Sequence, residues 1–191
     1  HYYNYYIMVL TKTPICNFGE KPHSFKLKGV DDKVYKLEDC KGNKGTIIMF
    51  ICNHCPYVKA IVKDLVKDVK SLKTLEINAV AIMSNDTINY PDDSFDKMKE
   101  FAKDNNFSFP YLIDETQEVA KKYGAVCTPD FFGYNGKNEL QYRGRMRELR
   151  DLKPVNNDKS DLFKAMKQIS ETQKGPENQT PSMGCNIKWF K

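Results

Sequence analysis

Two cysteines separated by two residues are the clearest candidates for chemistry in this sequence. Cys52 and Cys55 enclose Asn53 and His54, and Pro56 follows directly. A thiolate attacks a disulfide, and a second thiol three residues away can then displace the partner from the mixed disulfide. The spacing therefore predicts a dithiol that closes reversibly into a disulfide, with Cys52 attacking and Cys55 resolving.

The elements on either side of the dithiol favour its reactivity. Residues 46–51 are a continuous apolar run with β-branched side chains, typical of a strand buried on both faces. From Val58 to Leu72 apolar residues recur every three or four positions, which predicts an amphipathic helix with Pro56 in its first turn. Because a helix N-terminus is positive and offers free N–H groups, we expect the pKa of Cys52 to fall. His54 would stabilise the same thiolate and make the disulfide a stronger oxidant.

The remaining sequence predicts strands that alternate with helices. Hairpins are expected over residues 24–36 and 130–142, strands over 77–83 and 109–113, and helices from residue 95, over 116–123 and over 161–174. This order indicates an α/β fold with a central, mixed and mostly parallel sheet flanked by helices, an N-terminal hairpin and a C-terminal tail. We divide the chain into an irregular segment (1–17), one domain (18–174) and a tail that packs on it (175–191).

Composition and charge exclude several classes of function. The net charge of +5 comes from lysines interleaved with acidic residues, which is typical of solvated helix faces and not of a nucleic-acid interface. No apolar run approaches the roughly 20 residues that cross a membrane. Residues 1–10 lack the pattern of a signal peptide, so we expect a cytoplasmic protein; the chain begins with His1, and a removed export signal is left open.

A metal site is the main alternative for a Cys-x-x-Cys pair. Cys52, Cys55 and His54 offer soft ligands that suit copper or zinc. Structural zinc sites usually need a second pair of cysteines or histidines at similar spacing, and the sequence has none. The strand and helix around the pair favour redox chemistry instead, so neither a metal nor a cofactor is expected.

Several segments together resemble the thioredoxin superfamily, and within it the redoxin or peroxiredoxin-like branch related to alkyl hydroperoxide reductase and thiol-specific antioxidant proteins. The matching segments are residues 52–59, 84–86, 90–94, 123–129, 142–145 and 184–189. The resemblance implies a thioredoxin-like fold in which Cys52 attacks and Cys55 resolves. It also implies that Pro129 is a cis-proline facing the dithiol and that Thr128 offers backbone groups to an incoming thiol.

The sequence departs from that branch in two ways. Peroxiredoxins carry a proline and a threonine or serine shortly before the peroxide-attacking cysteine, whereas Ile48 and Lys44 stand at those positions before Cys52. A thiol peroxidase with antioxidant activity is thus the alternative hypothesis, ranked below thiol–disulfide exchange. Thioredoxins also keep a buried acid on the strand before the dithiol, and residues 46–51 carry no charge. Proton transfer from Cys55 would need His54, water or another group.

Two further cysteines are left open. Cys127 precedes Thr128 and Pro129, and Cys185 precedes an apolar chain end. Either is a packed small hydrophobe or an additional thiol of the redox centre. The expected substrate-facing and tuning set comprises Asn53, His54, Pro56, Cys127, Thr128 and Pro129, with Cys185 as an additional thiol. The expected partner is a protein or small-molecule thiol or disulfide, and the oligomeric state is left open.

Overall fold

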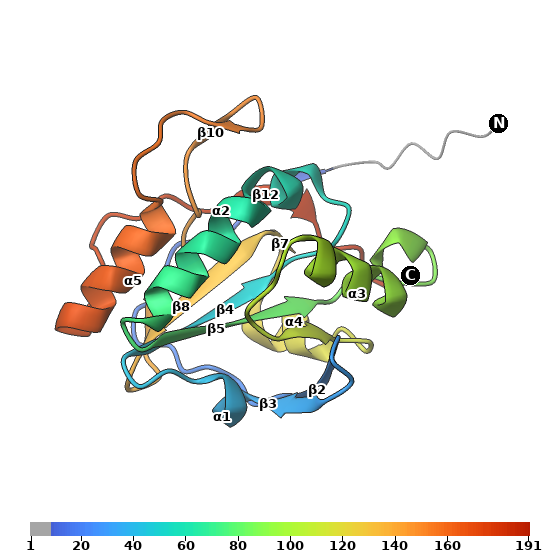
Figure 1. The fold of residues 1–191 in the computed structure, drawn as a ribbon, viewed down its shortest axis with the longest axis horizontal. Coiled ribbons are helices and arrows are strands. Elements are labelled where there is room, and N and C mark those ends of the chain that lie inside the picture. The colour runs from blue at the N-terminus through green and yellow to red at the C-terminus, as the bar shows by residue number, and fades with distance from the viewer. Residues whose placement is uncertain (1–8) are drawn as a thin grey trace.

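A seven-stranded sheet forms the centre of the computed structural model, which describes residues 9–191 (Figure 1). Its strands are ordered β3-β2-β6-β5-β4-β8-β9. They are β2 (Lys26–Gly29), β3 (Val34–Lys36), β4 (Gly45–Phe50), β5 (Ile77–Met83), β6 (Tyr111–Ile113), β8 (Asp130–Asn135) and β9 (Leu140–Tyr142). β4 and β5, and β5 and β6, pair in parallel, while the four other pairings are antiparallel.

The predicted mixed sheet, both hairpins and the two long apolar strands are confirmed. The emphasis on parallel pairing is corrected, because within residues 9–191 parallel pairs occur at the centre of the sheet alone. The flanking strands come from hairpins, and a tight hairpin can join only antiparallel strands.

Helices cover both faces of the sheet, which gives three layers (Figure 1). One face carries α2 (Pro56–Lys73), α3 (Phe95–Asp104) and α5 (Asp161–Thr172), and the other carries α1 (Leu37–Cys40) and α4 (Glu118–Tyr123). Strand β4 lies between these layers: Ile47 and Met49 pack toward α2, whereas Ile48 and Phe50 pack toward α1 and α4. Both faces of β4 are therefore buried, and this explains its unbroken apolar sequence.

Helix α2 carries the dithiol at its N-terminus and is held firmly against the sheet. Pro56 occupies its first turn, where a missing N–H costs nothing. Its buried face includes Ile61, Leu65 and Leu72, and Leu65 and Leu72 are fully buried. Burying each such side chain stabilises the fold by about 1.5–3 kcal/mol. The helix therefore provides a rigid base for the residues at its start.

A second, three-stranded sheet joins the two ends of the chain. It has the order β1-β12-β7, formed by β1 (Leu10–Lys12), β12 (Met183–Asn186) and β7 (Cys127–Thr128). The tail predicted to pack on the domain thus contributes its central strand. The prediction of an irregular segment over residues 1–17 is wrong for β1, which pairs with β12; residues 1–8 lie outside the described part of the chain.

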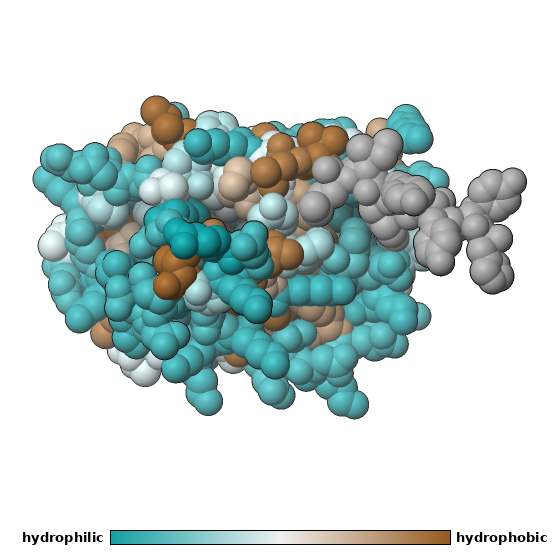
Figure 2. Space-filling model, turned by 90° about the horizontal axis from the view of Figure 1, so that it is seen from above, coloured by the Kyte–Doolittle hydropathy of each residue, from teal (hydrophilic) through white to brown (hydrophobic). Residues whose placement is uncertain are grey.

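Smaller elements complete the fold. The 3-10 turn η1 (Pro91–Asp93) precedes α3, and β10 (Leu149–Arg150) pairs with β11 (Lys153–Pro154). Among residues 9–191, no helix has both the length and the apolar character required to span a bilayer. The face seen in Figure 2 is mainly hydrophilic with separate hydrophobic patches. Exposed apolar side chains of the described chain include Leu10 and Met183 on the second sheet.

Candidate active site

The dithiol lies where the central strand β4 ends and helix α2 begins. Ile51 extends the sheet by one backbone hydrogen bond to Ile82, and Cys52 follows. Cys55 is the residue that caps the N-terminus of α2. Both cysteines are free thiols and each is only 1% exposed. A partner therefore reaches the sulfurs only through the residues that surround them.

The segment from Thr128 to Pro129 lies against both sulfurs. Cys52 Sγ is 3.5 Å from Thr128 Oγ1, and Cys55 Sγ is 3.4 Å from the Thr128 carbonyl oxygen. The peptide bond between Thr128 and Pro129 is cis. The structure thus brings four of the residues expected at the site into one cluster, although 73 positions separate Cys55 from Thr128.

The C-terminal strand adds a third sulfur to this cluster. In the β12–β7 pair, Cys185 is directly opposite Thr128. Residues directly opposite in an antiparallel pair point to the same face, so Cys185 shares the face from which Thr128 contacts the dithiol. The Cys55 sulfur also contacts Thr128, and the Cys185 thiol lowers the pKa of Cys55.

Cys127 points to the opposite face of β7. Its register partner is Asn186, and its sulfur lies 3.5 Å from the carbonyl oxygen of Pro129. Burial raises the pKa of the Cys127 thiol well above its usual value. The geometry does not support the expectation that Cys127 faces a substrate, because successive side chains of a strand alternate between its two faces.

The two residues between the cysteines are held by a buried acid that the sequence analysis did not identify. Asp93 of η1 is fully buried, and its Oδ1 accepts a 2.9 Å hydrogen bond from the backbone N–H of Asn53. Its Oδ2 lies 2.8 Å from His54 Nδ1 and accepts a 2.9 Å hydrogen bond from the Asn85 side chain. Tyr111 donates a 2.7 Å hydrogen bond to Asn53 Oδ1.

These contacts provide the acid that the strand before the dithiol lacks. Asp93 belongs to the segment 90–94 that carries the family resemblance, but its role depends on a fold that brings η1 over the dithiol. Its carboxylate orients His54, whose ring also stacks on Tyr90 at a centroid distance of 6.4 Å. Pro56, also expected at the site, is exposed in the first turn of α2.

The surroundings of the two sulfurs shift their pKa values in opposite directions. Hydrogen bonds from the Cys185 and Cys52 thiols lower the pKa of Cys55 to about 2, and the backbone N–H of Val58 adds to this effect. Burial raises the pKa of Cys52 well above its usual value, and the nearby Asp93 carboxylate contributes. The expectation of a lowered Cys52 pKa is therefore wrong. The helix begins at Pro56, and so its N–H groups favour Cys55.

Three side chains at the site are also close enough to share a metal ion. Ligand atoms of Cys52, His54 and Asp93 all lie within 4.8 Å of one another. A thiolate, an imidazole and a carboxylate are ligands that zinc accepts. Cys55 points instead toward Thr128 and Cys185. The ligand set suggested from the sequence, with Cys55 as the third member, is corrected accordingly.

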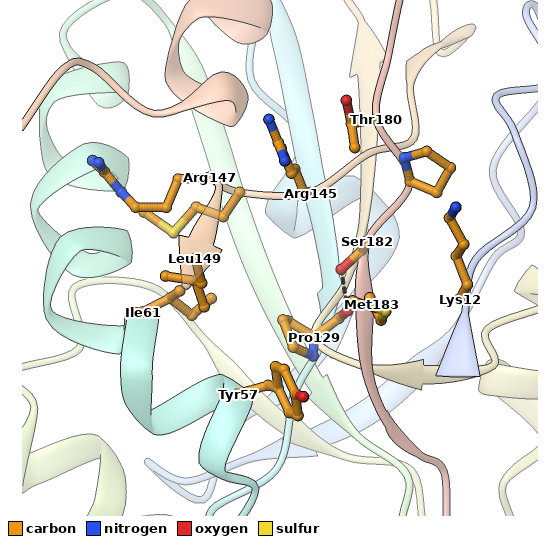
Figure 3. A pocket seen from close by; sticks show the side chains of 12 residues that line it. Lys12, Tyr57, Ile61, Pro129, Arg145, Arg147, Leu149, Thr180, Ser182 and Met183 are labelled. Carbon is orange, nitrogen blue, oxygen red and sulfur yellow. Dashed lines mark hydrogen bonds between the residues drawn. The ribbon is translucent and has the colours of Figure 1, made fainter. Parts of the chain in front are cut away.

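A cavity of about 230 Å³ opens beside Pro129 and the first turns of α2 (Figure 3). Its labelled lining residues are Lys12, Tyr57, Ile61, Pro129, Arg145, Arg147, Leu149, Thr180, Ser182 and Met183. Ser182 donates a 2.6 Å hydrogen bond to the Pro129 carbonyl oxygen, which ties the tail to the site. The cavity combines an apolar floor with cationic side chains at its edge.

Comparison with known proteins agrees with this geometry. The AhpC/TSA family matches residues 18–147. No curated protein matches the chain. A solved structure described as an uncharacterized conserved protein from Geobacillus kaustophilus is 40% identical, covers 96% of this chain and 97% of its own, and has a TM-score of 0.91. A hypothetical protein from Sinorhizobium meliloti 1021 is 33% identical, with coverages of 94% and 98% and a TM-score of 0.87.

More distant structures share the fold. The thioredoxin domain of a thiol-disulfide oxidoreductase from Bacteroides vulgatus is 15% identical, covers 70% of this chain and 89% of its own, and has a TM-score of 0.56. At this level of identity the similarity concerns the fold alone. Together with the central mixed sheet and its flanking helices, it identifies a thioredoxin-like fold.

Proposed function

This chain belongs to the AhpC/TSA family, and we propose that it is a thiol–disulfide oxidoreductase that cycles Cys52 and Cys55 between dithiol and disulfide. The observation that carries this proposal is that both sulfurs, at the start of α2, lie against the same residue, Thr128, which precedes the cis peptide bond to Pro129. Membership of the thioredoxin-like redoxins supports oxidoreductase chemistry in general. The identity of the two cysteines and their order of action are our inference.

The shared proton of the dithiol suggests how the reaction begins. The Cys52 thiol lowers the pKa of Cys55, so in this scheme the reduced pair carries one proton, which Cys52 holds. When a disulfide partner arrives, the Cys52 proton moves to Cys55 and the Cys52 sulfur attacks the nearer sulfur of the partner. One partner sulfur leaves as a thiolate and takes up a proton, and a mixed disulfide with Cys52 remains. Assigning the attack to Cys52 follows the family resemblance.

Resolution returns the charge to Cys55. Its thiolate is favoured by the Cys185 thiol and by the Val58 N–H, so it loses its proton readily and attacks Cys52 Sγ. The second partner sulfur then leaves as a thiol. The net reaction transfers two electrons from the dithiol to the partner; one of the two protons that the partner gains comes from the dithiol and the other from solvent, and every step is reversible.

His54 and Asp93 tune the Cys52 sulfur in this scheme. The 2.8 Å contact with Asp93 holds the imidazole near the Cys52 sulfur, where in this scheme it stabilises the negative charge of the reduced dithiol. We assign both residues to positioning and not to attack. The expected partner is a protein or small-molecule thiol, and the cavity next to Pro129 provides a surface for it.

Trapping experiments test this assignment. In a Cys55→Ser variant, a mixed disulfide with glutathione should accumulate on Cys52, because the resolving sulfur is absent. Mass spectrometry of the Cys52 peptide measures it, and Cys40→Ser is the control because Cys40 is buried at the end of α1, on the far side of the sheet. The two roles would be reversed if the mixed disulfide accumulated on Cys55 in a Cys52→Ser variant and did not accumulate on Cys52 in the Cys55→Ser variant.

A zinc-binding module is the second candidate, favoured by the proximity of Cys52, His54 and Asp93. Zinc and the disulfide exclude each other, since a disulfide sulfur is not a thiolate ligand. Titrating the reduced protein with zinc and measuring bound metal distinguishes the two functions. One equivalent bound tightly, lost in His54→Ala and blocking oxidation, would favour the metal module.

Peroxide reduction is the alternative associated with the family name. It would pass through a sulfenic acid at Cys52. The guanidinium of Arg143 is engaged by the buried Asp130 at 3.0 Å and does not contact either sulfur of the dithiol. We therefore expect hydrogen peroxide to oxidise the dithiol slowly. Rapid, stoichiometric sulfenic acid on Cys52 would instead support a peroxidase.

A further inference from the structure

The C-terminal strand is built to lie against the active site. Cys185 and Asn186 of β12 pair with Thr128 and Cys127 of β7. The strand is anchored on its other side by β1, with Leu10 opposite Cys185. The position of Cys185 is thus set by backbone pairing on both sides and not by a loose chain end.

A glycine allows this close approach. A Cβ atom on Gly184 would lie 2.0 Å from the carbonyl oxygen of Thr128 and 3.1 Å from Pro129 Cδ. These are backbone and ring atoms of the segment that contacts the dithiol, so they have little freedom to move aside. Only a residue without a side chain lets β12 come near enough to bring Cys185 to the dithiol.

Three sulfurs are thus gathered around Thr128. Cys52 and Cys55 both contact Thr128, and Cys185 is directly opposite Thr128 in the β12–β7 pair. The thiols of Cys185 and Cys52 both lower the pKa of Cys55. Cys185 is 6% exposed, compared with 1% for each of the other two, and its sulfur also receives the backbone N–H of Tyr57. Tyr57 is thus near Cys185 in space, and Met183 lies two residues before it on β12. Both residues line the cavity beside Pro129.

We propose that Cys185 is a third redox-active thiol, which exchanges with the Cys52–Cys55 disulfide to form a Cys55–Cys185 disulfide. This inference rests on the proposed function, which supplies the first disulfide. In the exchange, Cys185 loses its proton and attacks Cys55 Sγ, the Cys52–Cys55 bond breaks, and Cys52 leaves as a thiolate that takes up a proton. One S–S bond replaces another, so the oxidation level of the protein is unchanged.

The exchange would change what the oxidised protein offers to a partner. In the first form the disulfide is enclosed by Thr128 and the residues around Asp93. In the second it joins the start of α2 to β12. Tyr57, two residues after Cys55, and Met183, two residues before Cys185, both line the cavity, and Met183 is 47% exposed. We infer that a thiol partner in the cavity reduces the Cys55–Cys185 form. Cys52 is then free for a second partner.

The decisive experiment uses the full chain with Cys52→Ser. The protein is equilibrated across a series of reduced and oxidised glutathione, quenched, and its disulfides are mapped by mass spectrometry. We expect a reversible Cys55–Cys185 disulfide, which is lost on adding Cys185→Ser and kept on adding Cys40→Ser. Absence of that disulfide in the folded Cys52→Ser protein overturns the inference.

The wild-type and Cys185→Ser proteins keep this test separate from the proposed function. If Cys185→Ser forms the Cys52–Cys55 disulfide but no variant forms Cys55–Cys185, the function stands and the third thiol is refuted. If no protein forms Cys52–Cys55, the proposed function itself fails. Should Cys52→Ser not fold, both disulfides are sought in the oxidised wild type, where absence of Cys55–Cys185 again refutes the inference.

Discussion

Replacing Asp93 with asparagine should lower the pKa of Cys52. The carboxylate and the sulfur lie within 4.8 Å of each other, and both residues are buried. At an effective dielectric constant of about 20, two unit charges at that separation repel by about 3.5 kcal/mol, or about 2.5 pKa units. The adjacent His54 offsets part of this when it is protonated. We therefore expect the pKa of Cys52 to fall by about one to two units.

The assay follows the rate at which iodoacetamide modifies Cys52 as a function of pH, in a Cys55→Ser background. That background removes the sulfur with which Cys52 shares its proton. Asp92→Asn is the matched control, because it makes the same change in charge on an exposed neighbouring residue and should have little effect. An unchanged or raised pKa of Cys52 in a folded Asp93→Asn protein would refute the reasoning.

Three further predictions concern the surroundings of the dithiol. Gly184→Ala should destabilise the protein by about 1–3 kcal/mol in urea unfolding, because the new Cβ overlaps the Thr128 backbone, whereas Met183→Ala on the same strand should not. His54→Ala should make the dithiol more reducing by about 30 mV or more, measured against glutathione, because the imidazole near the Cys52 sulfur no longer stabilises the negative charge of the reduced dithiol; a higher midpoint would contradict this. Arg143→Ala should cost about 3–5 kcal/mol of unfolding free energy by leaving buried Asp130 unpaired. The control is Lys97→Ala, which breaks an exposed ion pair with Glu100; an equal loss of stability in that variant would argue against the prediction.

Much of the fold follows from local patterns in the sequence. Strand β4 and helix α2 have long, regular apolar periodicity, and Asn135 with Gly136 marks the β8–β9 hairpin. Strands β1, β7 and β12 have two to four residues each and no alternation, so only tertiary pairing creates them. The share of parallel pairing was overestimated because the sequence of a buried strand is similar whether its neighbours are parallel or antiparallel.

The candidate site was likewise predicted in part, where short motifs carry its residues, and missed where it depends on the fold. The dithiol, Thr128 and Pro129 were identified because they belong to short motifs. Asp93 was missed because it is 40 residues from Asn53 in sequence and reaches it only through the placement of η1. The direction of the Cys52 pKa shift was predicted wrongly because it depends on which cysteine stands at the N-cap of α2, and a shift of a few residues in the start of a helix changes that answer.

The central claim is that Cys52 and Cys55 form a reversible redox pair, and one titration tests it most directly. The purified protein is equilibrated across a glutathione series, and the Cys52–Cys55 disulfide is quantified by mass spectrometry. The account predicts a single reversible two-electron transition that disappears for this disulfide in Cys52→Ser and persists in Cys40→Ser. Sulfurs that stay reduced throughout the series, or that react only after a bound metal is removed, would contradict it.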